Sequence, residues 1–145
     1  MTDSERTRRI RVVAAVVQQG DRYLITQRRP TALLPLMWEF PGGRVEADET
    51  DAKALTREVY HRLHVTVEVG QLMSYVSHKY DRYVVDLHLY QCHITAGELR
   101  NVNVNNHAWV KSEEFDQYLF TPADESSVAA LLGLESDATS PDAAD

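Results

Sequence analysis

The sequence predicts one domain of the mixed α/β (α+β) class, with a mixed β-sheet and helices on its faces. Strand-like runs of β-branched and aromatic residues alternate along the chain with segments of helical periodicity. The chain has 145 residues, of which 43% are hydrophobic, so it is long enough for one core and short for two. No internal repeat or interdomain linker is evident, which leaves a single folded unit as the prediction.

The first predicted elements form a β-hairpin. Residues 10–19, IRVVAAVVQQ, are a β-branched apolar run, and Gly20 and Asp21 supply a turn before a second strand at 22–28. The stretch that follows contains three prolines and a Gly-Gly pair, which exclude a long helix. We expect a loop there, then a short strand at 38–40 and a second loop.

A helix is predicted from residue 51 to residue 63, where apolar residues recur every three or four positions. These apolar positions are Ala54, Leu55, Val59 and Leu63. Thr50 is expected to cap the start of the helix, and Glu49 suits the positive end of its dipole.

Two long strands are expected after this helix, at 65–78 and 82–94, and they should be antiparallel neighbours. The remaining predicted elements are a loop at 96–106, a short strand at 107–110, a short helix at 112–118 and a final helix at 123–132.

The net charge of the chain limits the kinds of ligand that it is expected to bind. The formal net charge is -7 at pH 7, which argues against a long nucleic acid as ligand because such ligands are held by clustered Lys and Arg. Part of this charge lies in residues 134–145, which contain no Lys or Arg and are expected to be a disordered acidic tail. Residues 1–8 are expected to form a flexible arm, so the folded domain should span 9–133.

The chain contains no apolar run of the length that crosses a membrane and no secretory signal at its N-terminus. The single cysteine, Cys92, lies in a strand-like stretch and is expected to be a buried, inert thiol. Together these features predict a cytoplasmic protein that does not bind membranes.

The strongest functional signal is the spacing of a glycine, a glutamate and an Arg-Glu pair. In GRVEADETDAKALTRE, five residues separate Gly43 from Glu49, and seven separate Glu49 from Arg57 and Glu58. The segment WEFPGG ends at the same glycine. This pattern resembles the signature of the Nudix hydrolases, G-x5-E-x7-R-E-U-x-E-E-x-G-U with U aliphatic, in the branch of MutT-like 8-oxo-dGTP diphosphatases and CTP pyrophosphohydrolases.

Other segments extend the resemblance over residues 9–132. The segment FTPAD, which ends at Asp124, resembles one whose last residue helps to hold the base. Asp124 could simply cap the final helix, and this role is compatible with base contact. Arg28 matches a nucleotide-contacting position, Arg82 falls near another, and the backbone near Phe40 is expected to line the base pocket. The resemblance implies a Nudix α/β/α sandwich, a nucleoside triphosphate or other nucleoside diphosphate derivative as ligand, and homodimers as one expected assembly.

The resemblance also implies a divalent cation, Mg2+ or Mn2+, that neutralises phosphate oxygens and activates water. Its implied ligands are Glu58, Glu49 and the carbonyl of Gly42, and Arg57 is implied to orient the carboxylates. In the family, two further glutamates follow at i+3 and i+4 from the first, so that all three lie on one face of the helix. An exposed helix arginine is the alternative interpretation of Arg57.

Several residues depart from this pattern. His61 and Arg62 stand where the two further glutamates are expected, His64 replaces the signature glycine, and the segment NVNVNNHAWV contains no acidic residue. An arginine about 5 Å from Mg2+ would be repelled by roughly 6 to 7 kcal/mol at an effective dielectric near 20. Arg62 is therefore expected either to turn away or to occupy the place of the metal, where it could bind phosphate.

Two functions stay open on these grounds. One is a diverged hydrolase, weakened or repurposed, with Glu58 as principal metal ligand and Glu49 and Arg57 in support. The other is a nucleotide-recognition module without catalysis on a Nudix fold. His61 and His64, at i and i+3, could bind a transition metal or could simply face solvent.

Overall fold

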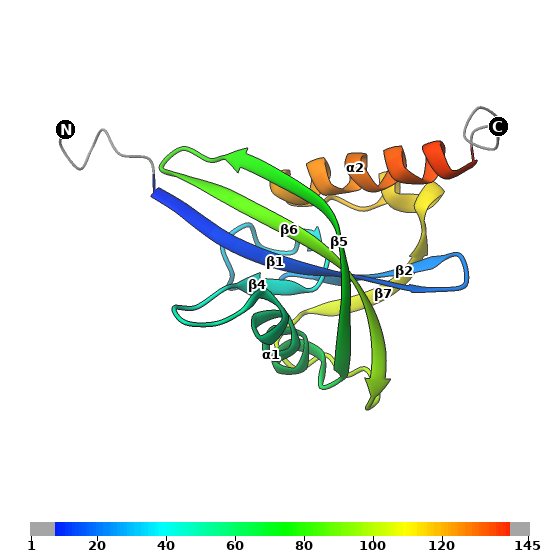
Figure 1. The fold of residues 1–145 in the computed structure, drawn as a ribbon, viewed down its shortest axis with the longest axis horizontal. Helices are drawn as coiled ribbons and strands as arrows, with labels where there is room; N and C mark the ends of the chain where they lie inside the picture. The colour runs from blue at the N-terminus through cyan, green and yellow to red at the C-terminus, as the bar shows by residue number, and fades with distance from the viewer. Residues whose placement is uncertain (1–7, 140–145) are drawn as a thin grey trace.

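The computed structural model describes residues 8–139, and Figure 1 gives the arrangement of its elements. In chain order these are β1 (Arg8–Gln19), β2 (Arg22–Gln27), β3 (Trp38–Glu39), β4 (Gly42–Arg44), α1 (Asp51–Leu63), β5 (Thr66–Lys79), β6 (Tyr83–Ala96), β7 (Asn106–Lys111), the 3₁₀ helix η2 (Ser112–Gln117) and α2 (Pro122–Thr139).

The strands in this part of the chain form one mixed sheet, as the sequence predicts. Its central order is β3-β2-β1-β6-β5, with β4 also paired to β1 and β7 to β2. β1 and β6 are parallel, whereas all the other pairs are antiparallel. The predicted hairpin of β1 with β2 and the predicted antiparallel pairing of β5 with β6 are both confirmed.

The two α-helices cover opposite faces of the sheet, which gives the predicted α/β/α arrangement (Figure 1). Because side chains alternate along a strand, β1 contributes to both layers. Val13, Ala15 and Val17 pack with the buried side chains of α1, while Ala14 and Val16 pack in the second core, on the α2 side. The sheet therefore separates two hydrophobic cores.

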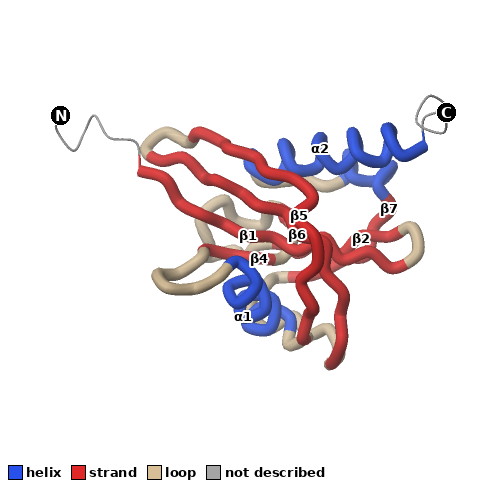
Figure 2. The backbone as a smooth tube through the Cα atoms, viewed as in Figure 1, coloured by secondary structure: helices blue, strands red, loops and turns tan. Residues whose placement is uncertain are grey.

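The β5–β6 hairpin is long and bent, as Figure 2 shows. Its register shifts between Val69 and Leu72 and again between Leu72 and Ser74, which marks β-bulges that bend the strands. As a result β5 contacts both α1 and α2, and the hairpin connects the two layers.

The sequence predicts a loop at residues 42–44, and this prediction is wrong because they form β4. A Cβ atom at Gly42 would lie 2.0 Å from the carbonyl oxygen of Val13, so only glycine allows β4 to approach β1 this closely. A Gly-Gly pair indicates a loop in a sequence, but here it permits a strand.

The expected domain boundaries need two corrections. Arg8 belongs to β1, where it pairs with Tyr83, and so it is not part of a flexible arm. α2 continues to Thr139, so residues 134–139 are helical and not a disordered tail. The extension is held because Leu131 is buried and the Glu135 carboxylate accepts a hydrogen bond from the Tyr23 hydroxyl. Residues 1–7 and 140–145, which the arm and tail predictions also covered, lie outside the described residues.

Cys92 is buried, as predicted, and burial raises the pKa of its thiol to about 12. A thiol with such a pKa stays protonated and unreactive at neutral pH. No helix within residues 8–139 has the length and the apolar character needed to cross a membrane.

Candidate functional site

The start of α1 is fixed to the sheet by polar contacts. The backbone N–H of Lys53 donates to the Thr50 hydroxyl at 3.2 Å, which is the predicted N-cap. Arg11 of β1 donates to both carboxylate oxygens of Asp51, at 2.8 and 2.7 Å, and Tyr90 of β6 donates to the same carboxylate. Arg11 holds the pKa of Asp51 at about 2. Two strands thus set the position from which the functional side chains of α1 project.

The end of α1 makes a sharp turn although histidine replaces the signature glycine. His64 adopts the left-handed conformation with φ 58° and ψ 30°, and its N–H donates to the Tyr60 carbonyl at 2.8 Å. The imidazole stacks on the Tyr60 ring at a centroid distance of 5.0 Å. This contact accompanies a conformation that is rare for residues other than glycine.

The asparagine-rich loop caps the last turn of α1. The backbone N–H groups of Val102 and Asn103 donate to the Arg62 carbonyl, and the Asn103 side-chain amide donates to the His61 carbonyl at 2.9 Å. These carbonyls have no partner within the helix. The loop that lacks an acidic residue therefore contacts α1 as a structural cap.

Arg57 connects two carboxylates of the predicted site. Its Nε and one terminal amino group donate to both oxygens of Glu49, at 2.7 and 2.9 Å, and its other amino group donates to Glu58 Oε1 at 2.7 Å. Arg57 lowers the pKa of Glu49 to about 2. This is the geometry that an orienting role of Arg57 requires.

Arg62 lies between Glu58 and Glu39. Its Nε donates to Glu58 Oε2 at 3.2 Å, and one terminal amino nitrogen lies 3.9 Å from Glu39 Oε2. Arg28 then donates to both oxygens of Glu39, at 3.1 and 3.3 Å. Arg62 thus lies among the acidic groups and does not turn away from them.

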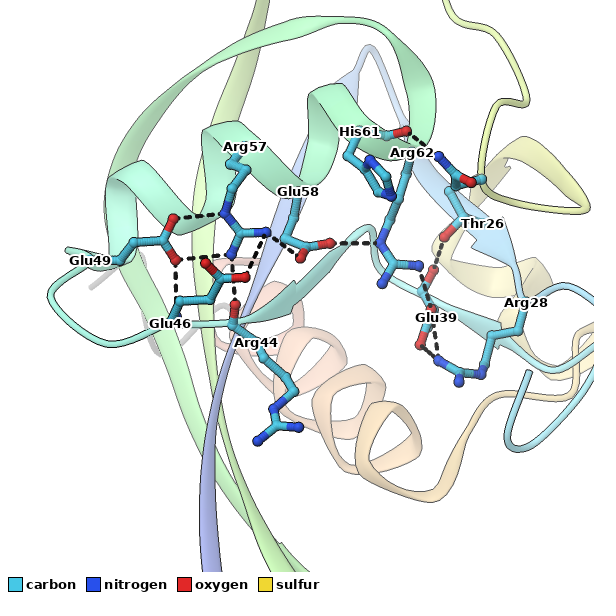
Figure 3. Close-up of polar contacts among 11 residues, drawn as sticks. Thr26, Arg28, Glu39, Arg44, Glu46, Glu49, Arg57, Glu58, His61 and Arg62 are labelled. Atoms are coloured by element: carbon cyan, nitrogen blue, oxygen red, sulfur yellow. Dashed lines mark hydrogen bonds and ion pairs between the residues drawn. The ribbon is translucent and has the colours of Figure 1, made fainter. Parts of the chain in front are cut away.

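Alternating acidic and basic side chains thus form one continuous row, which is drawn in Figure 3. We call it the ion-pair chain, and its members in order are Glu49, Arg57, Glu58, Arg62, Glu39 and Arg28. The carboxylates and guanidiniums in it are equal in number, so they neutralise one another without a bound ion.

The ion-pair chain borders a cavity of about 850 Å³. The site residues that line this cavity are Arg28, Glu39, Phe40, Gly42, Gly43, Glu58, Arg62 and Asp124. Three predicted site residues are not part of the lining, namely Glu49, Arg57 and Arg82, although Tyr83, the neighbour of Arg82, is. The structure thus brings most of the predicted substrate-binding residues together around one space.

Asp124 also lines the cavity. Its carboxylate accepts hydrogen bonds from the Phe40 N–H at 3.1 Å and from the Thr121 hydroxyl at 2.6 Å. Burial and the nearby Glu39 carboxylate raise the pKa of Asp124. Because α2 begins at Pro122, Asp124 lies in the first turn and is not the N-cap, which corrects the capping interpretation.

Gly43 positions the Glu58 carboxylate. A Cβ atom at Gly43 would lie 2.4 Å from Glu58 Cδ and 2.5 Å from Oε2, so the carboxylate packs directly on the glycine. Because Gly43 has no side chain, the Glu58 carboxylate can occupy the space beside it.

The implied Mg2+ or Mn2+ would use Glu58, Glu49 and the Gly42 carbonyl, but the side chains present do not fit such an ion. All four carboxylate oxygens of Glu49 and Glu58 accept hydrogen bonds from Arg57 or Arg62. In the described part of the chain, no three His, Cys, Asp or Glu side chains are grouped so that they could hold a metal. An ion would have to displace a guanidinium to gain its ligands.

Sequence reasoning did not assign a role to Glu39 or to the wall formed by Tyr80 and Tyr83. Glu39 pairs with Thr26 across two short strands, and that register places its carboxylate beside Arg28 and Arg62. Tyr80 stacks on Tyr83 at a centroid distance of 5.1 Å, at the turn of the β5–β6 hairpin. Glu39 was present in the WEFPGG segment, but only the fold places it in contact with α1.

Comparison with known proteins places this geometry in a family. A model described as the NUDIX domain matches residues 12–130. The chain is 30% identical over 125 residues to a CTP pyrophosphohydrolase of Escherichia coli (strain K12), covering 86% of this chain and 93% of that protein. It is 31% identical over 127 residues to a putative 8-oxo-dGTP diphosphatase 2 of Mycobacterium tuberculosis, covering 83% and 86%.

The fold comparison agrees with the sequence comparison. The solution structure of the E. coli ORF135 protein matches with a TM-score of 0.78 and 29% identity, covering 92% of this chain and 96% of that one. The domain match spans both α1 and the ion-pair chain. This chain belongs to the Nudix family, in the branch that resembles MutT-like diphosphatases and CTP pyrophosphohydrolases.

Proposed function

We propose that this chain binds a nucleoside triphosphate, or another nucleoside diphosphate derivative, and hydrolyses it slowly if at all. The observation that carries this proposal is one cavity with a varied lining. Asp124 and Phe40 line it together with Glu58 and Arg62 of α1. The relatives named for CTP and 8-oxo-dGTP support a nucleotide as the ligand class.

The base is proposed to bind near Asp124. Each of its carboxyl oxygens accepts one hydrogen bond within the protein, and each retains a further lone pair. An exocyclic amino group of a base is a suitable donor to such an oxygen. The stacked rings of Tyr80 and Tyr83 supply an apolar wall for an aromatic ligand, and the backbone near Phe40 is proposed to line the same pocket.

The phosphates are proposed to lie toward α1. Arg28 and Arg62 line the cavity and are proposed to contact the substrate, and Arg82 is proposed to approach it from the β5–β6 hairpin, next to Tyr83 of the lining. Hydrolysis would depend on Glu58, with Glu49 and Arg57 in support and the Gly42 carbonyl as a further oxygen donor for Mg2+ or Mn2+.

Slow hydrolysis follows from the state of these carboxylates. Cleavage of a diphosphate needs a charge that neutralises the phosphate oxygens and a group that activates water. The carboxylates of Glu49 and Glu58 instead form ion pairs with Arg57 and Arg62. A divalent ion therefore competes with two guanidiniums for the same oxygens. The same observation favours the second candidate function, a nucleotide-recognition module that retains the pocket without the chemistry.

A nucleotide panel tests the proposal. Ordinary and oxidised nucleoside triphosphates would be assayed for pyrophosphate release with Mg2+, with Mn2+ and without metal, and in parallel for thermal stabilisation of the protein. We expect ligand-dependent stabilisation with turnover well below about 1 per second. Asp124→Ala should remove most of the stabilisation, because it deletes the proposed base contact.

The outcomes separate the two candidate functions. Turnover at about 1 per second or more that Glu58→Gln abolishes would establish an ordinary hydrolase and contradict the recognition module. Absence of both turnover and stabilisation for every nucleotide would contradict the proposed ligand class.

A further inference from the structure

We propose that the Arg62 guanidinium is the phosphate-binding cation of this cavity, so that the chain binds its ligand without a metal ion. This inference rests on the proposed nucleotide binding and adds that the nucleotide binds as the metal-free species. A divalent ion held by carboxylates would be replaced by a cation that is covalently part of α1.

Arg62 is held in a fixed orientation with donors to spare. It follows Glu58 by one helical turn, so the two side chains lie on the same face of α1. Its Nε makes the hydrogen bond to Glu58, whereas its two terminal amino groups make no hydrogen bond with other residues in the described range. Arg62 lines the cavity and its side chain is 23% exposed. A guanidinium anchored through Nε presents its terminal amino groups as a planar pair, which suits bidentate binding of a phosphate.

The charge of the cavity wall also suits a free anion. Each glutamate in the lining already faces an arginine: Glu39 faces Arg28, Glu58 faces Arg62, and Glu46 lies 3.9 Å from Arg57. By contrast, Arg8 and Arg44 also line the cavity, and their side chains have no carboxylate partner among residues 8–139. A phosphate that enters this space therefore meets two arginines that no carboxylate in the described part of the chain neutralises.

The same geometry makes Arg62 and a metal ion alternatives. The oxygen that Arg62 contacts, Glu58 Oε2, is one that a divalent ion at this helix would need. Two cations that share this oxygen would repel each other strongly in a partly buried site. Added Mg2+ should consequently give little or no gain in ligand affinity.

Calorimetric titration of the 145-residue chain tests this inference. CTP and cytidine, then 8-oxo-dGTP and 8-oxo-deoxyguanosine, would be titrated in EDTA and in Mg2+ with the wild type, Arg62→Gln, Arg62→Lys and Arg100→Gln. The ratio of triphosphate affinity to nucleoside affinity isolates the contribution of the phosphates. Arg100 is a matched control because it is exposed and does not line the cavity.

We expect the wild type to bind a triphosphate with the same affinity in EDTA as in Mg2+, within about twofold. Arg62→Gln should lower triphosphate affinity by about tenfold, the loss of one charge-assisted contact, and leave nucleoside affinity unchanged. Arg62→Lys should give an intermediate loss, because it keeps the charge but not the planar pair of donors. Arg100→Gln should match the wild type.

Three results would count against this account, and they are distinguishable. Loss of triphosphate binding in EDTA with nucleoside binding retained would overturn the role of Arg62 while leaving the nucleotide pocket in place. An unchanged affinity ratio in folded Arg62→Gln would do the same. If neither nucleosides nor triphosphates bind under any condition, the proposed function itself fails. The wild-type comparison tests whether triphosphate binding needs a metal ion even if one variant does not fold, and Arg62→Lys then tests the role of Arg62.

Discussion

Arg62 and Glu58 form an ion pair one helical turn apart on α1, with Arg62 Nε 3.2 Å from Glu58 Oε2. Arg57 contacts the other oxygen of the same carboxylate at 2.7 Å. The principal glutamate of the motif is therefore enclosed by two arginines. This arrangement determines both how the site is stabilised and which ligands can approach Glu58.

Glu58→Gln should destabilise the protein, because it leaves Arg57 and Arg62 without the carboxylate that pairs them. Glu58 is only 13% exposed and its partners are also partly shielded, so we expect a loss of roughly 1 to 3 kcal/mol in the free energy of unfolding. Chemical denaturation would measure this. Glu68→Gln is the matched control, since Glu68 is an exposed residue of β5, and it should change stability by less than about 0.5 kcal/mol. If Glu58→Gln and Glu68→Gln have the same free energy of unfolding, the ion-pair chain contributes nothing to stability.

The two glycines of the motif should respond differently to alanine. At Gly42 the added Cβ would lie 2.0 Å from the Val13 carbonyl oxygen, a collision with backbone that cannot relax, so Gly42→Ala should lose about 3 kcal/mol or more or fail to fold. At Gly43 the Cβ would collide with the Glu58 side chain, which can rotate. Gly43→Ala should therefore stay folded, lose roughly 1 to 2 kcal/mol and bind nucleotides more weakly.

Thermal denaturation together with the ligand titration would distinguish the two glycine variants. If Gly43→Ala proves as destabilising as Gly42→Ala, then Glu58 is not free to move, and the space above Gly43 does not have the role described for it.

The contact of Asp51 with Arg11 should give stability that depends on pH. The pKa of Asp51 falls from 3.8 to about 2 on folding, so the folded state binds fewer protons than the unfolded state between these values. The stabilisation is complete above about pH 4 and is lost as the pH falls toward 2. Asp51→Asn should lower stability by about 1 kcal/mol at neutral pH, because Arg11 is half exposed, and the difference from wild type should vanish near pH 2.

Melting temperatures of the wild type and Asp51→Asn across this range would provide the check. Asp21→Asn is a suitable control, because the Asp21 side chain is 73% exposed and its nearest cation is 3.7 Å away. A difference between wild type and Asp51→Asn that does not change with pH would indicate that the asparagine acts through something other than charge.

The bounds of α1 and the pairing of the long strands could be predicted because they depend on local patterns. Thr50 caps the helix and Leu55 and Val59 are buried along one stripe, so periodicity and capping determine this element. β4 could not be predicted, because its glycines form a strand only through close approach to β1. The extension of α2 depends likewise on a distant residue, Tyr23, which the local sequence does not indicate.

The candidate site could be predicted in part for the same reason. The spacing of Glu49, Arg57 and Glu58 along one helix places them together, and the motif signals this directly. The position of Glu39 beside Arg62 depends on how β3 pairs with β2, which is a long-range property. The end of α1 is a case in which the motif misleads. The signature has glycine in the left-handed turn, but here His64 adopts that conformation.

His61 and Arg62 depart from the family signature, which has glutamate at both positions. Replacing both by glutamate should restore a metal site. His61→Glu with Arg62→Glu removes the guanidinium from Glu58 and places carboxylates at i+3 and i+4, on the same face of α1. We expect this double variant to gain Mg2+-dependent pyrophosphate release. Arg29→Gln with Arg100→Glu serves as a control because it changes the net charge by the same amount and neither arginine lines the cavity, and it should gain no activity.

Titration of Mn2+ onto the wild type and the His61→Glu, Arg62→Glu variant, followed by electron paramagnetic resonance, tests most directly whether Arg62 has replaced the metal. The account predicts that the wild type binds Mn2+ at least about tenfold more weakly than the double variant, since its Glu58 oxygens are already engaged by Arg57 and Arg62. Equal Mn2+ affinity in the two proteins would contradict it, because Arg62 would then leave Glu58 free to hold the ion.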